Sequence, residues 1–129
     1  MQRREVLQAM GAGIALAAGT GEARMAEPIQ LHVDLEVDPA KEADLVKTFQ
    51  TVFRPTISRQ PGFVDVKLLK LRSIAVGSPS APRWRLLISF TTEELRQKWV
   101  ATEDHQRAWP QMEKNLRGAK FSAALYDVQ

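Results

Sequence analysis

The element that sets the fold is the stretch IQLHVDLEVDP at residues 29–39. Apolar and polar side chains alternate strictly from Ile29 to Val37, which is the pattern of a strand with one buried face and one polar face. Asp38 is followed by Pro39, a pair that favours a helix N-cap with proline in the first helical turn. We therefore predict a strand that leads directly into a helix.

The helix after Pro39 is predicted to pack on a sheet. Its apolar residues recur at spacings of three and four, as in one stripe along a helix; they are Leu45, Val46, Phe49, Val52, Phe53 and Ile57. Pro55 interrupts this stripe, because proline lacks the N–H of a helix interior and restricts the residue before it. We expect a kink or a helix end near Arg54.

Three further strands and a second helical region follow. The turn QPG at 60–62 precedes the predicted strand FVDVKLLKL, the Ser- and Pro-rich IAVGSPSAP predicts a loop, and RWRLLISF at 83–90 predicts a third strand. Thr91 and Glu94 have the spacing of a capping box, so a helix is expected to begin there and to carry Leu95 and Trp99 inward.

The remainder of the chain predicts the end of this second helical region and a last strand. We expect a break near Trp109–Pro110 and then a short helical stretch through Met112 and Leu116 that ends at Gly118. KFSAALYDV closes the chain as the fourth strand.

The predicted order is strand, helix, strand, strand, helix, strand, which is the α+β, ferredoxin-like βαββαβ arrangement with helices on one face of an antiparallel sheet. The other face would be bare. We expect it to present an apolar patch that a homodimer covers sheet against sheet; its predicted members are Val64, Val66, Leu68, Leu87 and Tyr126.

Composition limits the possible functions. The 129 residues suffice for one domain, and the net charge of +3 comes from interspersed signs, so a nucleic-acid partner is not expected. The absence of cysteine excludes disulfides and thiolate metal sites, and two histidines, His32 and His105, are too few for a three-histidine metal site. Because no glycine motif for a flavin, nicotinamide or phosphate is present, no bound cofactor and no metal are predicted.

Residues 1–26 resemble a twin-arginine export signal. Arg3 and Arg4 precede the Ala- and Gly-rich stretch 9–18, which is too short to span a bilayer, so no stable membrane anchor is expected. The prediction is a signal peptide at 1–26 and a domain at 27–129 exported to the periplasm or beyond. Two alternatives remain: a retained N-terminal arm, or a cytoplasmic protein that begins at Met25.

In this order the elements resemble the antibiotic biosynthesis monooxygenase (ABM) family of dimeric α+β barrels. The resemblance rests on IQLHVDLEV, QPGFVDVKLLKL, RWRLLISFTTEEL and WVATEDHQRAW, and it covers nearly all of residues 29–128. The resemblance implies a homodimer. Members of the family include cofactor-independent oxygenases of quinols and phenols, haem-degrading enzymes and proteins without established activity. Trp99 and His105 match the family's Trp-to-His segment, with Thr102 in the hydroxyl position between them.

The haem-degrading branch is disfavoured by two departures from its pattern. The first strand has no asparagine, and Trp109 stands where that branch has a histidine. The function expected from the resemblance is therefore a cofactor-independent monooxygenase acting on a small aromatic quinol or phenol. The alternatives are a non-catalytic small-ligand-binding or stress-related barrel, and a lactone isomerase of the same shape.

His105 is the predicted catalytic residue, since an imidazole with a pKa of about 6.5 can accept a phenolic proton. Trp99 and Trp109 would supply flat walls for an aromatic ring, with Tyr126 and Arg85 as further substrate-binding candidates. Trp99 lies six residues before His105 and shares a cavity with it only if the helix bends. The competing interpretation makes both tryptophans core residues and His105 a surface or interface residue. His32 is expected to be exposed or to form a dimer contact.

Overall fold

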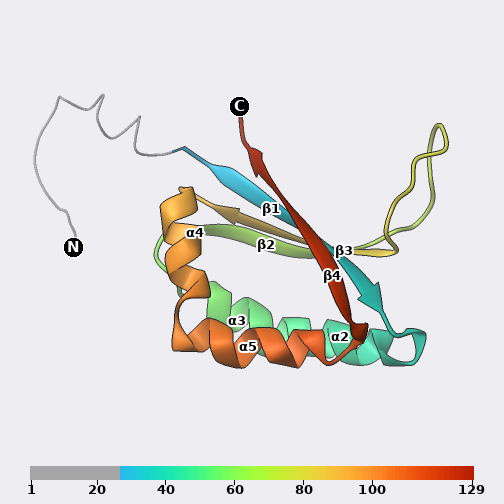
Figure 1. Cartoon of the computed structure of the whole chain (residues 1–129), viewed down its shortest axis with the longest axis horizontal. Coiled ribbons are helices and arrows are strands. Elements are labelled where there is room, and N and C mark those ends of the chain that lie inside the picture. Colours follow the sequence, from blue (N-terminus) through green and yellow to red (C-terminus); the bar gives the residue numbers. More distant parts are fainter. Residues whose placement is uncertain (1–26) are drawn as a thin grey trace, which may run out of the picture.

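The computed structural model describes residues 27–129, and the export signal predicted at 1–26 lies outside this range. Four antiparallel strands form one sheet in the order β2-β3-β1-β4, with the helices gathered on one side of it (Figure 1). The strands are β1 (Ile29–Val37), β2 (Phe63–Lys70), β3 (Trp84–Phe90) and β4 (Leu116–Asp127). The predicted ferredoxin-like α+β fold is confirmed.

The first helical region is continuous but changes its winding. A 3-10 turn η1 (Pro39–Lys41) leads into α2 (Glu42–Thr48), then a π-helical segment η2 (Phe49–Phe53) and α3 (Arg54–Ile57). Asp38 caps its start, since Asp38 Oδ1 accepts the Ala40 N–H at 3.0 Å. The kink predicted at Pro55 takes the form of this wider π turn, which precedes the proline and relieves its clash with the helical backbone.

The second helical region differs from the prediction at both its start and its break. Thr92, not Thr91, caps α4 (Glu93–Val100), because Thr92 Oγ1 accepts the Leu95 N–H at 3.1 Å. The break lies at Ala101–Thr102, and α5 (Glu103–Glu113) continues past Pro110 as one α-helix. Burial of Ala108 and Met112 on either side of Pro110 holds the helix together despite the missing N–H.

The last strand begins earlier than expected. Leu116 is its first residue rather than the end of a helix, and Gly118 and Ala119 have positive φ values of 61° and 56°. A register shift between Leu35 and Val37 on β1 lies opposite this point. The local twist turns the chain from α5 onto the edge of the sheet next to β1.

The core fills the space between the helices and one face of the sheet. β3 buries every second residue there, and β1 buries Ile29, Val33 and Leu35 on the same face, with Leu31 and Val37 partly buried. This confirms the alternation seen in the sequence. The buried side chains include Ile29, Val33, Leu35, Leu45, Phe49, Phe53, Ile57, Leu86, Ile88, Phe90, Trp99 and Met112.

The open face of the sheet is more polar than the sequence suggested. Val66 and Leu68 were expected there, but a register shift near Phe63 turns both toward the helices, and Val66 is buried at 6% exposure. Leu87 and Tyr126 remain on the open face, in register with the polar residues His32 and Gln30 of β1. The apolar patch is therefore smaller than predicted. Within residues 27–129, no helix is both long and apolar enough to cross a membrane.

Candidate functional site

A cavity of about 340 Å³ lies between the helix-covered face of the sheet and the pair α4 and α5. Its size falls within the range of small-molecule sites. Most of its walls are apolar, and they come from strands β1, β3 and β4, from η2, and from both helices. The lining residues are Leu31, Val33, Phe53, Leu86, Ile88, Arg96, Trp99, Val100, His105, Trp109, Phe121 and Ala123.

The mouth of the cavity can be located from the exposure of these residues. Trp99 and Leu86 are buried, whereas Val100 of α4 is 37% exposed and Phe121 of β4 is 44% exposed. The opening therefore lies between α4 and the edge strand β4. Trp109 is in edge contact with Phe121, with ring centroids 5.0 Å apart, so it forms part of this rim.

Thr102 creates the bend that the site requires. Its hydroxyl donates to the Trp99 carbonyl at 2.6 Å and accepts the His105 N–H at 3.1 Å, so one side chain ends α4 and begins α5. On an uninterrupted helix, Trp99 and His105 would project about 120° apart around the helix axis. With the bend, their rings meet edge to face with centroids 4.9 Å apart.

The predicted aromatic residues are thus brought together in one cavity. Trp109 packs edge-on against Phe53, at 6.3 Å between centroids, and against Phe121. Trp99 also contacts Phe53, at 6.0 Å. Phe53 therefore supports both tryptophans from the π segment of the first helical region.

His105 is held in its neutral form. Burial lowers its pKa below the usual value of 6.5, and the positive charge of Arg96 lowers it further. Its Nδ1 is buried and has no hydrogen-bond partner within residues 27–129. A buried polar atom left unpaired costs free energy. A neutral imidazole that lines a cavity can accept a proton from a bound hydroxyl group.

Arg96 adds a charge that the sequence reasoning did not place in the site. Its Nε and Nη2 donate to the two carboxylate oxygens of Glu93 at 2.6 and 2.7 Å. Glu93 also accepts from Gln97 Nε2 at 2.8 Å, and the pKa of the Glu93 carboxyl is lowered, mainly by Arg96. The Arg96 guanidinium is therefore fixed in a two-point ion pair at the cavity wall.

The structure separates the other two substrate-binding candidates from this cavity. Arg85 lies on the open face, where its Nε donates to Asp34 Oδ1 at 2.8 Å. Tyr126 lies on the same face against His32, with ring centroids 4.5 Å apart. His32 Nε2 is 3.2 Å from Gln30 Oε1, and its pKa is lowered by burial and by Arg85. These residues form a polar cluster on the side of the sheet opposite His105.

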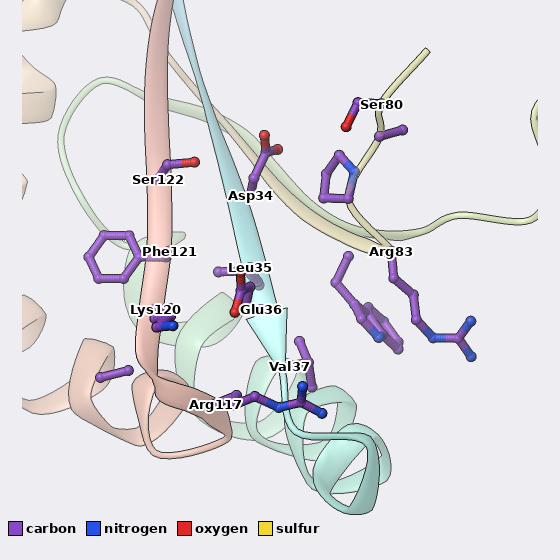
Figure 2. A pocket seen from close by; sticks show the side chains of 14 residues that line it. Asp34, Leu35, Glu36, Val37, Ser80, Arg83, Arg117, Lys120, Phe121 and Ser122 are labelled. Atoms are coloured by element: carbon purple, nitrogen blue, oxygen red, sulfur yellow. The ribbon is translucent and has the colours of Figure 1, made fainter. Parts of the chain in front are cut away.

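A second depression lies at the end of β1, and its chemistry is different. It is an open groove of about 830 Å³ between β1, the start of β4 and the loop that precedes β3 (Figure 2). Charged side chains of both signs line it, among them Asp34, Glu36, Arg83, Arg117 and Lys120. Figure 2 shows Phe121 directed away from Ser80 and Arg83. Because the groove is open and its charges are mixed, it lacks the enclosed apolar walls that would hold an aromatic ring.

Arg96, Phe53 and Phe121 line the cavity but were not assigned to a site from the sequence, and the first two of them left a signal. Arg96 lies three residues before Trp99, a spacing that puts both on one face of α4. Phe53 belongs to the apolar stripe that was assigned to the core alone. Phe121 gave no usable signal, since its place at the mouth depends on the pairing of β4 with β1.

No group of three or more His, Asp or Glu side chains in the part of the chain that the structure describes is arranged to hold a metal ion. Arg96 and His105 are the polar lining residues of the cavity. A guanidinium beside an imidazole suits an organic ligand with a hydroxyl or anionic oxygen better than a cation.

Comparison with known proteins agrees with this architecture. The model of the family "Antibiotic biosynthesis monooxygenase" (ABM) matches residues 28–111. No match was found among curated proteins. Among solved structures, a candidate antibiotic biosynthesis monooxygenase from Caulobacter crescentus is similar with a TM-score of 0.65 and 17% identity, over 85% of this chain and 98% of that one.

Two further similar structures are an oxygenase and a protein of unknown function. A point mutant of SnoaB, a cofactor-independent oxygenase from Streptomyces nogalater, is similar with a TM-score of 0.64 and 16% identity, over 81% of this chain and 95% of SnoaB. A dimeric ferredoxin-like protein of unknown function from Thermobifida fusca is similar with a TM-score of 0.61 and 14% identity, over 80% of this chain and 92% of that one. At these identities the likeness shows the fold.

Proposed function

Since the chain belongs to the antibiotic biosynthesis monooxygenase family, we propose that it is a cofactor-independent monooxygenase that oxidises a small quinol or phenol-type aromatic compound. Family membership supports a monooxygenase-type function. The observation that carries the finer proposal is the largely apolar cavity in which a neutral His105 lies beside the two tryptophans. One face of a flat ring would pack against indole, with its hydroxyl directed to the imidazole.

The proposed reaction uses the substrate as the source of electrons. His105 accepts the phenolic proton, and the resulting phenolate gives one electron to dioxygen. The two radicals then combine to form a carbon–oxygen bond at a ring carbon that carries hydrogen. His105 returns its proton to the outer peroxide oxygen, which leaves as water with the hydrogen of the ring carbon when the O–O bond breaks. A quinone remains, so one phenol and one dioxygen give one quinone and one water. The apolar walls keep bulk water from the charged species.

Oxygen consumption tests this proposal. The protein, treated with a chelator, is mixed with a panel of quinols and phenols in an oxygen electrode. His105→Ala should fold normally and lower turnover by roughly 10²–10⁴-fold, the usual contribution of a positioned general base. Gln111→Ala, a change at an exposed position further along α5 that does not line the cavity, serves as the control and should match wild type.

Two results would contradict the oxygenase. A folded His105→Ala variant with unchanged oxygen uptake would show that His105 takes no part in the reaction. A wild-type protein whose melting temperature rises with ligand but which consumes no oxygen above background would be a binding protein instead.

We also propose that the protein is a homodimer formed through the open sheet face. Two of the similar solved structures are described as dimeric ferredoxin-like proteins, and Leu87 and Tyr126 supply apolar area on that face. Leu87→Asp should dissociate the dimer in sedimentation, while Val76→Asp, at an 87% exposed site in the loop before β3, should not. A wild-type monomer at micromolar concentration would refute the proposal.

Export remains a proposal that rests on the sequence of residues 1–26. Replacing Arg3 and Arg4 together by lysine should retain the protein in the cytoplasm, as measured by fractionation of expressing cells. A native protein found only in the cytoplasm and beginning at Met25 would be evidence for the alternative start.

A further inference from the structure

The cavity contains a permanently charged group for which the reaction above has no role. Arg96 is the one side chain of fixed charge among the described residues that line the cavity. Arginine stays protonated at any ordinary pH, so Arg96 can neither donate nor accept the proton that His105 handles. A charge at the wall of an apolar cavity is costly unless something compensates it.

Glu93 compensates this charge from outside the cavity. The carboxylate holds Nε and Nη2 of Arg96, but Glu93 is not among the cavity-lining residues. A guanidinium has five N–H donors, so the two bonds to Glu93 leave three N–H groups for other partners. Glu93 therefore fixes the orientation of Arg96 without using all its hydrogen-bonding capacity.

The positive charge of Arg96 acts on the interior of the cavity. It lowers the pKa of His105, which lies across the bend on α5. Apolar walls screen such a charge poorly compared with water, so an anionic oxygen in the same space would be stabilised by it. The same field disfavours a cationic ligand.

We propose that Arg96 determines the specificity of this cavity by selecting flat aromatic ligands that carry one ionised oxygen. The oxygen would contact the free N–H groups of Arg96 while the ring packs against Trp99 and Trp109. This inference rests on the proposed function insofar as the ligand is the deprotonated substrate, but the binding preference itself requires no turnover and no dioxygen.

The test compares a coloured phenol with its neutral methyl ether. 4-Nitrophenol and 4-nitroanisole have nearly the same shape, and only the phenol can ionise, with a change in absorbance. Wild type should bind 4-nitrophenolate more tightly than 4-nitroanisole. Arg96→Met should weaken binding of the anion by about ten- to a hundredfold, the usual effect of a hydrogen bond to a charged group, and leave the ether nearly unchanged.

Arg107→Met is the matched control. Arg107 also pairs with an acidic residue three positions earlier, Asp104, but its side chain is exposed and does not line the cavity. Its removal should change neither affinity. Arg96→Lys keeps the charge but loses the two-point bond to Glu93, so it should retain the preference for the anion with reduced affinity.

A measurement on wild type alone keeps the proposal testable if Arg96→Met does not fold. Bound 4-nitrophenol should ionise at a lower pH than the free compound, which absorbance reports directly. Ionisation at the same or a higher pH, or equal binding of anion and ether by wild type and Arg96→Met, would overturn the proposal. Anion preference without oxygen uptake in any quinol assay would refute the oxygenase alone, and uptake without anion preference would refute the role of Arg96 alone.

Discussion

Truncation of Trp99 should destabilise the domain strongly but leave the other wall of the cavity in place. Trp99 is 3% exposed and contacts Phe53 and His105 through its ring. Replacing a buried tryptophan by alanine costs about 3–5 kcal/mol. Trp99 lines the cavity as well as the core, so we expect a value near the lower end of this range, about 3 kcal/mol.

This loss should be visible in thermal unfolding followed by circular dichroism. A cost of about 3 kcal/mol corresponds to a fall in melting temperature of roughly 12–24 °C for a domain of this size. Trp109→Ala is the comparison, because Trp109 is only partly buried at the cavity mouth and its removal should cost clearly less. If Trp99→Ala unfolds within about 1 kcal/mol of wild type, or if Trp109→Ala costs more, the assignment of Trp99 to the core and Trp109 to the rim is wrong.

Two further predictions concern His105 and the bend beside it. The pKa of His105 is lowered in the folded state from an unfolded value near 6.5, so the unfolded state binds the proton more readily. The contribution of His105 to the free energy of unfolding should therefore be complete above pH 6.5 and fall as the pH drops from 6.5 toward the folded pKa. His105→Gln should remove this part of the pH dependence in urea titrations, leaving that of His32, and an unchanged profile would contradict the burial of the imidazole. Thr102→Ala should cost about 1 kcal/mol as a lost N-cap and should also weaken ligand binding, because Thr102 joins Trp99 to His105. A loss of stability with unchanged binding would show that the bend does not depend on this hydroxyl.

The alternation in residues 29–37 and 84–90 was sufficient to predict the sheet and its buried face. Each strand there has one polar and one apolar side, and local sequence decides which side is which. The buried face of β2 could not be predicted in this way, because FVDVKLLKL has apolar residues on both sides. The register shift near Phe63, a property of its pairing with β3, turned Val66 and Leu68 toward the helices.

The site was predicted in part for a similar reason. The sequence indicated that Trp99, His105 and Trp109 belong together if the helix bends, but the bend was assigned to Pro110. Proline is a strong local signal, yet buried neighbours held α5 intact around it. The actual break depends on a threonine cap, which is a weaker signal and competes with many similar Ser and Thr positions. Arg85 and Tyr126 could be placed only with the strand pairing known.

The pairing of β1 with β4 has a consequence for the order in which the chain can fold during synthesis. Ile29, the first residue of the sheet, is opposite Asp127, at the far end of the described chain. β1 can pair with β3 as soon as residue 90 has left the ribosome, but its other edge stays unpaired until the C-terminal residues are made. Until then Phe121 is missing from the cavity wall, and the unfinished β1 edge is open to pairing with another chain. Ribosome-bound intermediates that end before residue 116 should therefore have neither a closed cavity nor a protected sheet edge.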